Sequence, residues 1–342
     1  MKYTYWPLLV LALTLSTQAS ARSPIVLPPG LQIEVLVEVP APTGLAFAPA
    51  GSGFSRHLFV SDLANRILEV PVVGPSAGVP TLFATTGPDP AELEFTPSDL
   101  RAVYGDYLYV AANNRDEGRP GDCGGTVQRV DPSGRTEDFT RIEDCISCRN
   151  RPDVEDGLGE PIGLAFGRAP FKPQLYVGNS TDWPANIAKL DATGRIDVFL
   201  DSSVCSRVLA PAGLELDPVG GFDTEMYFSD WICRCIRTVD DRGEVSAPIA
   251  TFPAFVGDVE FSPGGLFGDY LYIASGDTVY RMDAGLSVTV FATGFQSVIT
   301  NGAFFPQDSL EFHPSGCRMY IADVRAGRVY EVRSAAGVCA SR

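Results

Sequence analysis

Carboxylate side chains recur at alternate positions in several short apolar segments of this 342-residue sequence. Three of these segments read AGLELDP (212–218), GDVEFSP (257–263) and SLEFHP (309–314). If each is a β-strand with one face towards a shared cavity, the carboxylates converge. Carboxylates at close range raise one another's pKa values unless a cation or an arginine compensates them. The pattern therefore predicts a site for a metal ion, calcium by its preference for oxygen ligands, or for a cationic ligand.

A repeat in the sequence indicates which elements carry these residues. GDYLYVAA (105–112) returns almost unchanged as GDYLYIAS (268–275). Six similar segments can be aligned: HLFVSD (57–62), YLYVAA (107–112), QLYVGN (174–179), EMYFSD (225–230), YLYIAS (270–275) and RMYIAD (318–323). Their central aromatic residues lie 45 to 67 residues apart. The alternation of apolar residues within each copy is typical of a β-strand.

Each copy is flanked by further expected strands. The segments expected to form the preceding strands are TGLAFAP (43–49), SDLRAVY (98–104), IGLAFGR (162–168), AGLELDP (212–218), GDVEFSP (257–263) and SLEFHP (309–314). A third strand follows each copy, and after most of these a turn leads to a fourth strand. Four antiparallel strands in each of six units predict an all-β fold, the six-bladed β-propeller.

The two ends of the chain support this count. The sixth unit stops after its third strand, whereas residues 32–39 form a strand that belongs to no unit. We expect this N-terminal strand to complete the last blade and close the ring, which leaves no long exposed edge. The alternative fold, two β-sandwich domains, accounts for neither the repeat nor the extra strand.

The innermost strand of each blade of a propeller lines the central channel, and its side chains alternate between the channel and the blade interior. The residues expected to face the channel are Gly44 and Ala46, Asp99 and Arg101, Gly163 and Ala165, Gly213 and Glu215, Asp258 and Glu260, and Ser309 and Glu311. The candidate ligand or metal-binding residues are therefore Asp99, Arg101, Glu215, Asp258, Glu260 and Glu311. The alternative is that Arg101 pairs with some of the acids and water fills the remaining space.

The N-terminus has the features of a secretory signal peptide. Lys2 precedes an apolar run, 6–15, that is too short to span a membrane, and Ala19-Ser20-Ala21 fits a cleavage site. We expect residues 1–21 to be removed and 22–342 to form a single domain that is secreted or periplasmic. The net charge of −16 argues against nucleic-acid binding, because phosphate backbones repel such a chain. A closed ring needs no partner for stability, so a monomer is expected.

Eight cysteines in an exported chain favour disulfides. We call the mouth at which the innermost strands begin face one, and the opposite mouth face two. Strand direction places six cysteines at face one, with their pairing left open: Cys123, Cys145, Cys148, Cys205, Cys233 and Cys235. Cys317 and Cys339 are predicted to pair at face two. Trp183 and Trp231 lie in face-one loops, where each could stack on a flat ligand or pack beneath a loop.

The segments PTGLAF (42–47) and HLFVSDLANRILEV (57–70) resemble the NHL-repeat pattern. The whole of 22–342 is similar to the wider six-bladed group that contains gluconolactonases, paraoxonases and strictosidine synthase-like proteins. The resemblance implies a propeller and, for the enzymes among the first two, a channel calcium ion and hydrolysis of lactones or esters. The positions that match the metal ligands of gluconolactonases are Thr43, Ser98, Ile162 and Ala212. None of them is a carboxylate, so a calcium site here would have to be built differently.

The segment LPPGLQIEVLVEVPAPTGLAF (27–47) also resembles pyrroloquinoline-quinone sugar dehydrogenases. Enzymes of that type need a histidine base near the quinone. The two histidines of this chain, His57 and His313, are both expected at face two, away from the loops of face one.

Two functions remain. The first is binding of a small molecule, a metal ion or an extracellular protein partner at face one, without catalysis. The second is a calcium-dependent lactonase or esterase in the same mouth. Its candidate ligands or bases are Asp99, Glu215, Asp258, Glu260 and Glu311.

Overall fold

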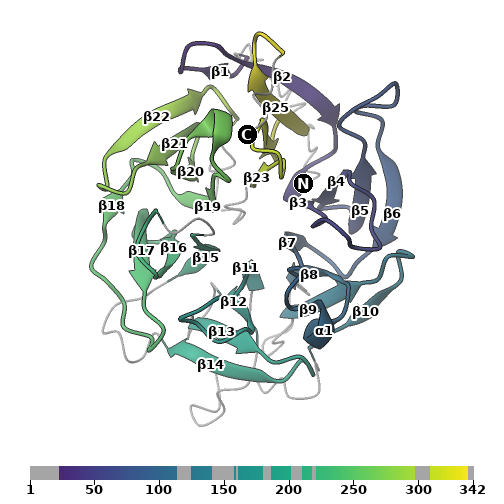
Figure 1. Ribbon diagram of the computed structural model, residues 1–342, viewed down its shortest axis with the longest axis vertical. Coiled ribbons are helices and arrows are strands. Elements are labelled where there is room, and N and C mark those ends of the chain that lie inside the picture. Colours follow the sequence, from purple (N-terminus) through teal and green to yellow (C-terminus); the bar gives the residue numbers. More distant parts are fainter. Residues whose placement is uncertain are drawn as a thin grey trace, which may run out of the picture.

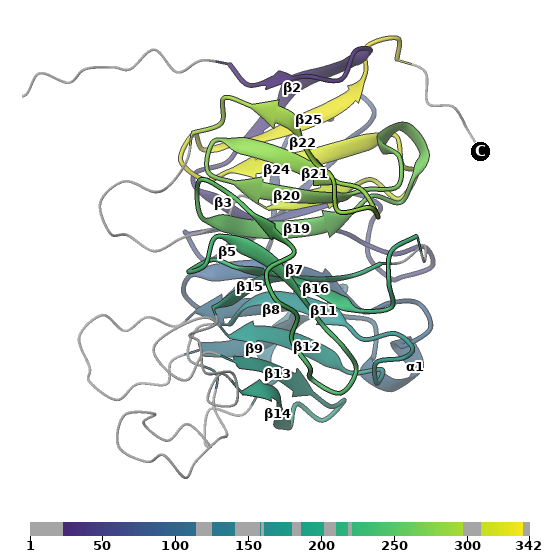
Figure 2. The same cartoon turned by 90° about the vertical axis from the view of Figure 1, so that its left-hand side faces the viewer.

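The structure is a computed structural model that describes residues 23–113, 125–140, 158, 161–179, 186–201, 210–217, 221–296 and 309–337. Six antiparallel sheets stand around a central axis (Figure 1). Figure 2 shows the same sheets edge-on. The predicted all-β six-bladed β-propeller is therefore confirmed. Among the described residues, no helix combines the length and hydrophobicity that crossing a bilayer requires.

Blades 1 to 3 each contain four strands, named here from the axis outwards. Blade 1 consists of β3 (Pro42–Phe47), β4 (Leu58–Asp62), β5 (Arg66–Val70) and β6 (Thr81–Thr85). Blade 2 consists of β7 (Pro90–Phe95), β8 (Leu108–Asn113), β9 (Gly125–Val130) and β10 (Thr136–Asp138), with the short helix α1 (Arg101–Tyr104) between β7 and β8. Blade 3 consists of β11 (Pro161–Phe166), β12 (Leu175–Asn179), β13 (Asn186–Leu190) and β14 (Ile196–Asp201).

Blades 4 to 6 follow the same plan. Blade 4 consists of β15 (Pro211–Leu216), β16 (Met226–Asp230), β17 (Cys235–Val239) and β18 (Ala250–Thr251). Blade 5 consists of β19 (Val256–Phe261), β20 (Leu271–Ser275), β21 (Thr278–Met282) and β22 (Val288–Thr293), with the 3-10 turn η2 (Gly265–Phe267) between β19 and β20. Blade 6 consists of β23 (Leu310–Phe312), β24 (Arg318–Asp323), β25 (Arg328–Ser334) and β2 (Leu31–Glu38).

The N-terminal strand closes the ring. β2 pairs antiparallel with β25, from Leu31 opposite Ser334 to Glu38 opposite Arg328. This confirms the expected completion of the last blade, and Figure 1 shows the purple and yellow strands side by side. A second N-terminal strand, β1 (Ile25–Val26), was not predicted. It pairs with β22 and adds a fifth strand to blade 5.

The repeated aromatic residue joins neighbouring blades. It occupies the second strand of each blade and is almost completely buried in all six: Phe59, Tyr109, Tyr176, Tyr227, Tyr272 and Tyr320. In blade 2 its ring lies 5.5 Å from that of Phe166 on the inner strand of blade 3, and in blade 6 it lies 5.3 Å from Phe47 of blade 1. Such pairs contribute about 0.5–1.5 kcal/mol each beyond the burial of their area. The repeat is therefore the framework that holds the ring together.

The duplicated GDYLY sequence forms the same local structure in blades 2 and 5. In blade 2 the Arg129 guanidinium lies 4.4 Å from the centre of the Tyr107 ring, and in blade 5 Arg281 lies 4.7 Å from that of Tyr270. The preceding Gly105 has a φ of 81°, a conformation that favours glycine. These contacts are cation–π interactions that attach the third strand to the start of the second.

The prediction that 98–104 forms the inner strand of blade 2 is wrong. The inner strand is β7, and the second half of 98–104 forms α1. Leu100 and Tyr104 are buried whereas Val103 is 61 % exposed, which is the spacing of a helical turn. The correct assignment was readable, because AELEFTP (91–97) matches GDVEFSP (257–263) of blade 5, and α1 then takes the place of η2.

Candidate functional site: an acidic central channel

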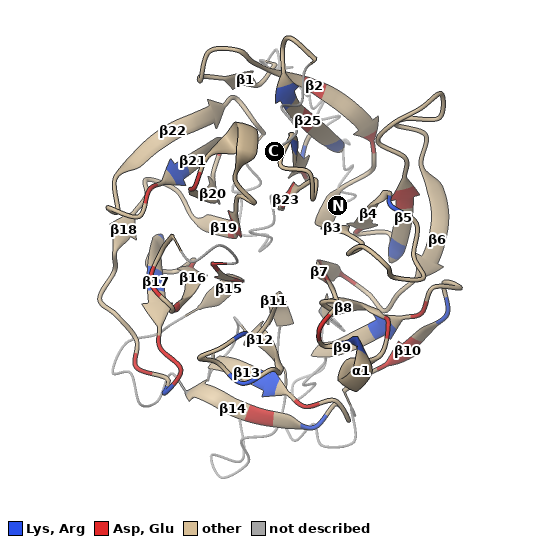
Figure 3. Cartoon of the chain, in the orientation of Figure 1, with Lys and Arg blue, Asp and Glu red and all other residues tan. Residues whose placement is uncertain are grey.

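The six inner strands place equivalent side chains around the channel. The fifth residue of each full-length strand lies opposite the repeated aromatic residue of the neighbouring second strand, as Glu94 does with Tyr109 and Glu260 with Tyr272. The same register defines the whole set: Ala46, Glu94, Ala165, Glu215, Glu260 and Glu311. We call the four acids of this set the glutamate tier. Figure 3 shows acidic residues on β7, β15, β19 and β23 beside the central opening.

A second set of residues lies closer to face one. Two positions before the glutamate tier, the inner strands carry Gly44, Glu92, Gly163, Gly213, Asp258 and Ser309. A β-bulge interrupts the inner-strand pairing near this level in blades 1 to 5, for example between Val256 and Val259. Bulges re-aim side chains beside functional sites. Here the skipped pairs include Glu92 and Asp258, which line the pocket at the mouth of the channel.

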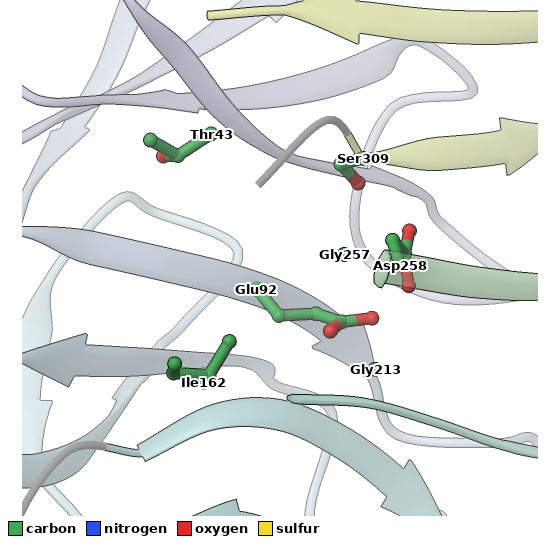
Figure 4. Close-up of a pocket in the computed structure, with 7 residues that line it drawn as sticks. All are labelled: Thr43, Glu92, Ile162, Gly213, Gly257, Asp258 and Ser309. Carbon is green, nitrogen blue, oxygen red and sulfur yellow. The ribbon is translucent and has the colours of Figure 1, made fainter. Parts of the chain in front are cut away.

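A narrow pocket with a cavity volume of about 10 Å³ occupies the channel at this level (Figure 4). Its walls come from all six blades: Thr43, Glu92, Ile162, Gly213, Gly257, Asp258 and Ser309. Figure 4 shows the Glu92 carboxylate extending from β7 towards the side of the pocket that holds Asp258 and Ser309. The space inside the pocket is about that of one water-sized sphere. Its size suits a single ion or water molecule.

Asp258 is the most firmly held acid of the channel. One carboxylate oxygen accepts the backbone N–H of Val259 at 2.7 Å, and the other accepts that of Leu310, in blade 6, at 2.8 Å. The side chain is only 6 % exposed. Ser309 continues the connection, because its Oγ accepts the backbone N–H of Leu45 in blade 1 at 3.2 Å. The carboxylate therefore joins two blades and has a fixed orientation.

The electrostatics of the channel favour protonated acids when no cation is present. Burial raises the pKa of Glu94 to about 8, against the opposing field of the Arg168 guanidinium. Burial also raises the pKa of Asp258 to about 7, although its hydrogen bonds from Leu310, Val259 and Ser309 lower it. Burial and then the neighbouring carboxylates raise the pKa values of the other channel acids well above their usual range: Glu92, Glu215, Glu260 and Glu311. Each of these four acids is therefore sensitive to the charge of the others.

The donor set of the channel fits a hard cation. The side chains that could coordinate are carboxylates and hydroxyls, and calcium takes six to eight oxygen ligands of this kind. Among the described residues, the carboxylates do not form a closed cage, because the one group with three ligand atoms within 4.8 Å of one another lies elsewhere. The acids are instead spread around the bore. That arrangement leaves coordination positions for water or for a ligand.

Four of the predicted channel acids lie in the inner strands as expected: Glu215, Asp258, Glu260 and Glu311. Asp99 and Arg101 do not, which corrects their assignment. Asp99 is exposed in the turn before α1. Arg101 contacts Asp106 at 3.3 Å and donates to the backbone oxygens of Pro49 and Ala50. The acids that sequence reasoning missed are Glu92 and Glu94, because the inner strand of blade 2 was placed too late in the chain.

In blade 2, the residue that matches a gluconolactonase metal ligand also differs from the predicted one. Thr43 and Ile162 lie in the pocket wall, as their alignment implies. The equivalent residue of blade 2 is Ala91 rather than Ser98, since β7 is the inner strand. None of these residues supplies a carboxylate, so the channel of this chain holds its acids at other positions.

Trp231 follows β16 at face one and packs beside Phe255, with the ring centres 5.5 Å apart. It is partly buried against the core of blades 2 and 3, which is the packing alternative considered for it. Cys233 and Cys235 are joined by a disulfide, and with Asp230 they form the compact group outside the channel. Asp230 is already engaged there by the Arg237 guanidinium at 3.0 Å.

The remaining predicted loop residues lie outside the described residues, apart from Cys317, which precedes β24. They are Trp183, Cys123, Cys145, Cys148, Cys205 and Cys339. The pairing of Cys317 with Cys339 therefore stays a prediction. The same holds for the signal peptide, since residues 1–22 are outside the described ranges.

Comparison with known proteins supports the fold. No family model matches the sequence. No curated protein matches it either. Among solved structures, a gluconolactonase from Xanthomonas campestris is similar, with a TM-score of 0.64, 14 % sequence identity, and coverage of 92 % of this chain and 95 % of that chain.

Two other similar structures show how widely this fold is used. Virginiamycin B lyase from Staphylococcus aureus has a TM-score of 0.52 at 13 % identity, covering 89 % of this chain and 99 % of that chain. A chain of the nidogen/laminin complex has a TM-score of 0.52 at 13 % identity, covering 74 % and 80 %. A gluconolactonase, a lyase and a chain of a protein complex are thus similar in architecture to this chain. At these identities the likeness shows the six-bladed fold alone, and function has to be argued from the channel.

Proposed function

We propose that this protein binds a divalent cation, calcium by the chemistry of its donors, in the central channel, and that a ligand approaches that cation from face one. The observation that carries the proposal is the convergence of six carboxylates from four blades, with Asp258 buried and the other five partly buried: Glu92, Glu94, Glu215, Asp258, Glu260 and Glu311. Keeping that many acids together without a cation requires most of them to be protonated near neutral pH. A bound cation would remove this cost.

The ligand side of the proposal rests on the pocket. Glu92, Asp258 and Ser309 offer polar groups beside the apolar side chain of Ile162, and hydrogen bonds hold Asp258 and Ser309 in place. A small molecule or the tip of an extracellular protein partner fits this mouth better than nucleic acid does, because the chain carries a net charge of −16. Export to a secreted or periplasmic location, disulfide bracing of the face-one loops and a monomeric state complete the proposal.

Thermal unfolding of the purified protein, first stripped with chelator, tests cation binding. Calcium should raise the midpoint in proportion to the logarithm of its concentration, since a ligand that binds only the folded state stabilises it by linkage. At 100 times the dissociation constant the gain is about 2.7 kcal/mol. Glu215→Gln should weaken the shift, whereas Asp99→Asn, which removes a carboxylate outside the channel, should not. An unshifted wild-type midpoint together with the absence of tightly held metal would reject the proposal.

A second candidate function is hydrolysis of a lactone or ester in the same pocket. The pKa of Asp258, raised to about 7, suits a general base near neutral pH. The Asp258 carboxylate would take a proton from water as the water oxygen bonds to the acyl carbon. The bond from that carbon to the ring or ester oxygen then breaks, and the departing oxygen takes up a proton. A cation bound in the channel would supply Lewis-acid polarisation of the carbonyl oxygen.

A panel of lactones and aryl esters decides between binding and catalysis. Wild-type protein should hydrolyse at least one of them with a rate that rises through pH 7, and Asp258→Ala should lose that activity. Because Asp258 also joins two blades, Glu92→Gln serves as a second variant and Asp99→Ala as the matched control. A wild-type protein that binds calcium yet hydrolyses nothing would leave the binding function and eliminate the hydrolase.

A further inference from the structure

One basic residue stands at the face-two end of the channel. Arg168 follows Phe166, the last residue of β11, by two positions and is exposed to solvent. The inner strands run from face one to face two, so Arg168 lies beyond the level of the glutamate tier, which β11 occupies with Ala165. Two inner strands, β3 and β11, contribute no acid to the channel, and β11 carries this arginine just beyond its end.

The sequence marks this position as an exception among the six blades. Two residues beyond the last apolar residue of the inner strand, the other five blades all carry proline: Pro49, Pro97, Pro218, Pro263 and Pro314. Proline suits a turn that leaves a strand, since its φ is fixed and it donates no hydrogen bond. Blade 3 replaces that turn residue with Arg168 and delays its proline to Pro170. A framework requirement does not explain the replacement, because the other five blades carry proline rather than arginine at this position.

The neighbours of β11 explain what the charge does. β11 packs between β7 and β15, the strands that carry Glu94 and Glu215. The Arg168 guanidinium lowers the pKa of each of these two acids, opposing the effect of their burial. Among the described residues, Arg168 makes no ion pair within 4.0 Å, so its charge acts on both Glu94 and Glu215 rather than being neutralised by one partner.

We infer that Arg168 is the built-in counter-ion of the channel: it supports the glutamate tier when no cation is bound and repels cations at the face-two end, so that it weakens their binding. This inference rests on the proposed cation-binding function and names the residue that sets its affinity. Two consequences follow with opposite signs. Removing the guanidinium should make the cation-free protein less stable and should make cation binding tighter.

The opposite signs of the changes in stability and in cation affinity distinguish the counter-ion role of Arg168 from a purely structural role. A residue that only supports the turn would, when replaced, lower the stability of the cation-free and the cation-bound protein together and would leave affinity unchanged or weaker. Arg168 has the same sign of charge as the cation. Removing that charge, even from a partly screened position, should tighten binding of a divalent cation at least about fivefold. The gain should shrink as salt is added, because Arg168 is exposed.

The test compares Arg168→Gln with Arg168→Lys and with Arg242→Gln. Arg242 is exposed in the turn after β17, which ends at the same face but in an outer strand, so it matches the charge change away from the channel. Calcium affinity is measured by titration calorimetry at pH 7.5 in low and high salt, and urea unfolding is measured in chelator at pH 8. We expect tighter calcium binding and lower cation-free stability in Arg168→Gln alone, and wild-type behaviour in Arg168→Lys and Arg242→Gln.

The outcomes also separate this inference from the proposed function. If wild type binds calcium and Arg168→Gln matches Arg242→Gln in both measurements, the counter-ion role is overturned while cation binding stands. If wild type binds no calcium, the proposed function fails and the affinity part of this inference fails with it. The unfolding measurement then still decides whether Arg168 supports the glutamate tier.

Discussion

The inner strands β11 and β19 occupy equivalent places in blades 3 and 5 but give the channel different surfaces. Both bury an apolar residue and an aromatic residue inside the blade, Leu164 and Phe166 in one and Val259 and Phe261 in the other. Towards the channel, β11 presents glycine and alanine where β19 presents Asp258 and Glu260. The comparison shows that the fold depends on the interior-facing half of each strand. The other half is free to carry charge.

Close approach between blades explains why the neutral strands carry glycine. A Cβ atom added at Gly163 would lie 1.8 Å from the carbonyl oxygen of Ala212 in blade 4. Asp258 occupies the equivalent place in blade 5, where its carboxylate accepts the N–H of Leu310 from blade 6. One blade junction is thus closed by direct contact between backbones and the other by a side chain.

The largest effect is expected from a substitution at the junction of blades 3 and 4, where the two backbones are in direct contact. Gly163→Ala should destabilise the protein by about 3 kcal/mol or more, since the backbone of β15 has to move to admit the methyl group. Urea unfolding measures the change. Gly221→Ala, at a site where an added Cβ meets nothing within 4 Å, is the control and should be near neutral. Similar values for the two variants would contradict the close approach.

The channel acids should make the stability of the cation-free protein depend on pH. Burial raises the folded-state pKa of Glu94 to about 8, so the folded protein binds more protons than the unfolded chain at pH values below that. The free energy of unfolding of the cation-free protein should therefore fall as pH rises from about 5 to about 8. The double variant Glu94→Gln/Glu260→Gln should reduce this fall by about 2 kcal/mol.

The measurement is urea unfolding in chelator at several pH values between 5 and 8. The double variant Glu34→Gln/Glu244→Gln, in which both side chains are exposed, is the matched control and should keep the wild-type slope. If the channel variant and the control show the same slope, the channel acids titrate like surface acids and the electrostatic account of the channel is wrong.

A smaller effect is expected where a hydroxyl links two blades. Ser229 Oγ accepts the backbone N–H of Gly213 at 2.9 Å and donates to the carbonyl oxygen of Gly257 at 2.5 Å. Ser229→Ala leaves both buried groups without this partner and should cost about 1–3 kcal/mol. Thermal or urea unfolding measures it, with the exposed Ser76→Ala as control. A loss no greater than that of Ser76→Ala would show that the blades do not depend on this link.

The smallest effect is a null result that tests the corrected assignment of blade 2. Asp99 lies in an exposed turn outside the channel, so Asp99→Ala should change neither calcium affinity nor stability by more than about 0.5 kcal/mol. Titration calorimetry and urea unfolding measure the two quantities. A clear loss of calcium binding in this variant would restore Asp99 to the site and undo the placement of β7 in the channel.

Much of the fold and part of the candidate site were predictable from sequence. The repeated aromatic residue predicted the blades because its burial between blades demands the same residue type six times, and the unmatched strand near the N-terminus predicted the closure by β2. Alternation within a strand then placed Glu215, Glu260 and Glu311. Glu92 and Glu94 were missed because α1, an insertion of one helical turn, separates β7 from β8 and shifts the spacing on which the alignment depended.

The sequence by itself determined the number of blades, the ring closure and the acidic character of the inner strands, because these follow from short-range periodicity and from a repeat that each blade must satisfy separately. The tertiary structure decided which acids meet, that Asp258 joins two blades, and that β11, which leads to Arg168, packs between the strands that carry Glu94 and Glu215. These relations join residues from different blades, far apart in the chain. Their geometry is set by the packing of whole blades around one axis, which no local pattern encodes.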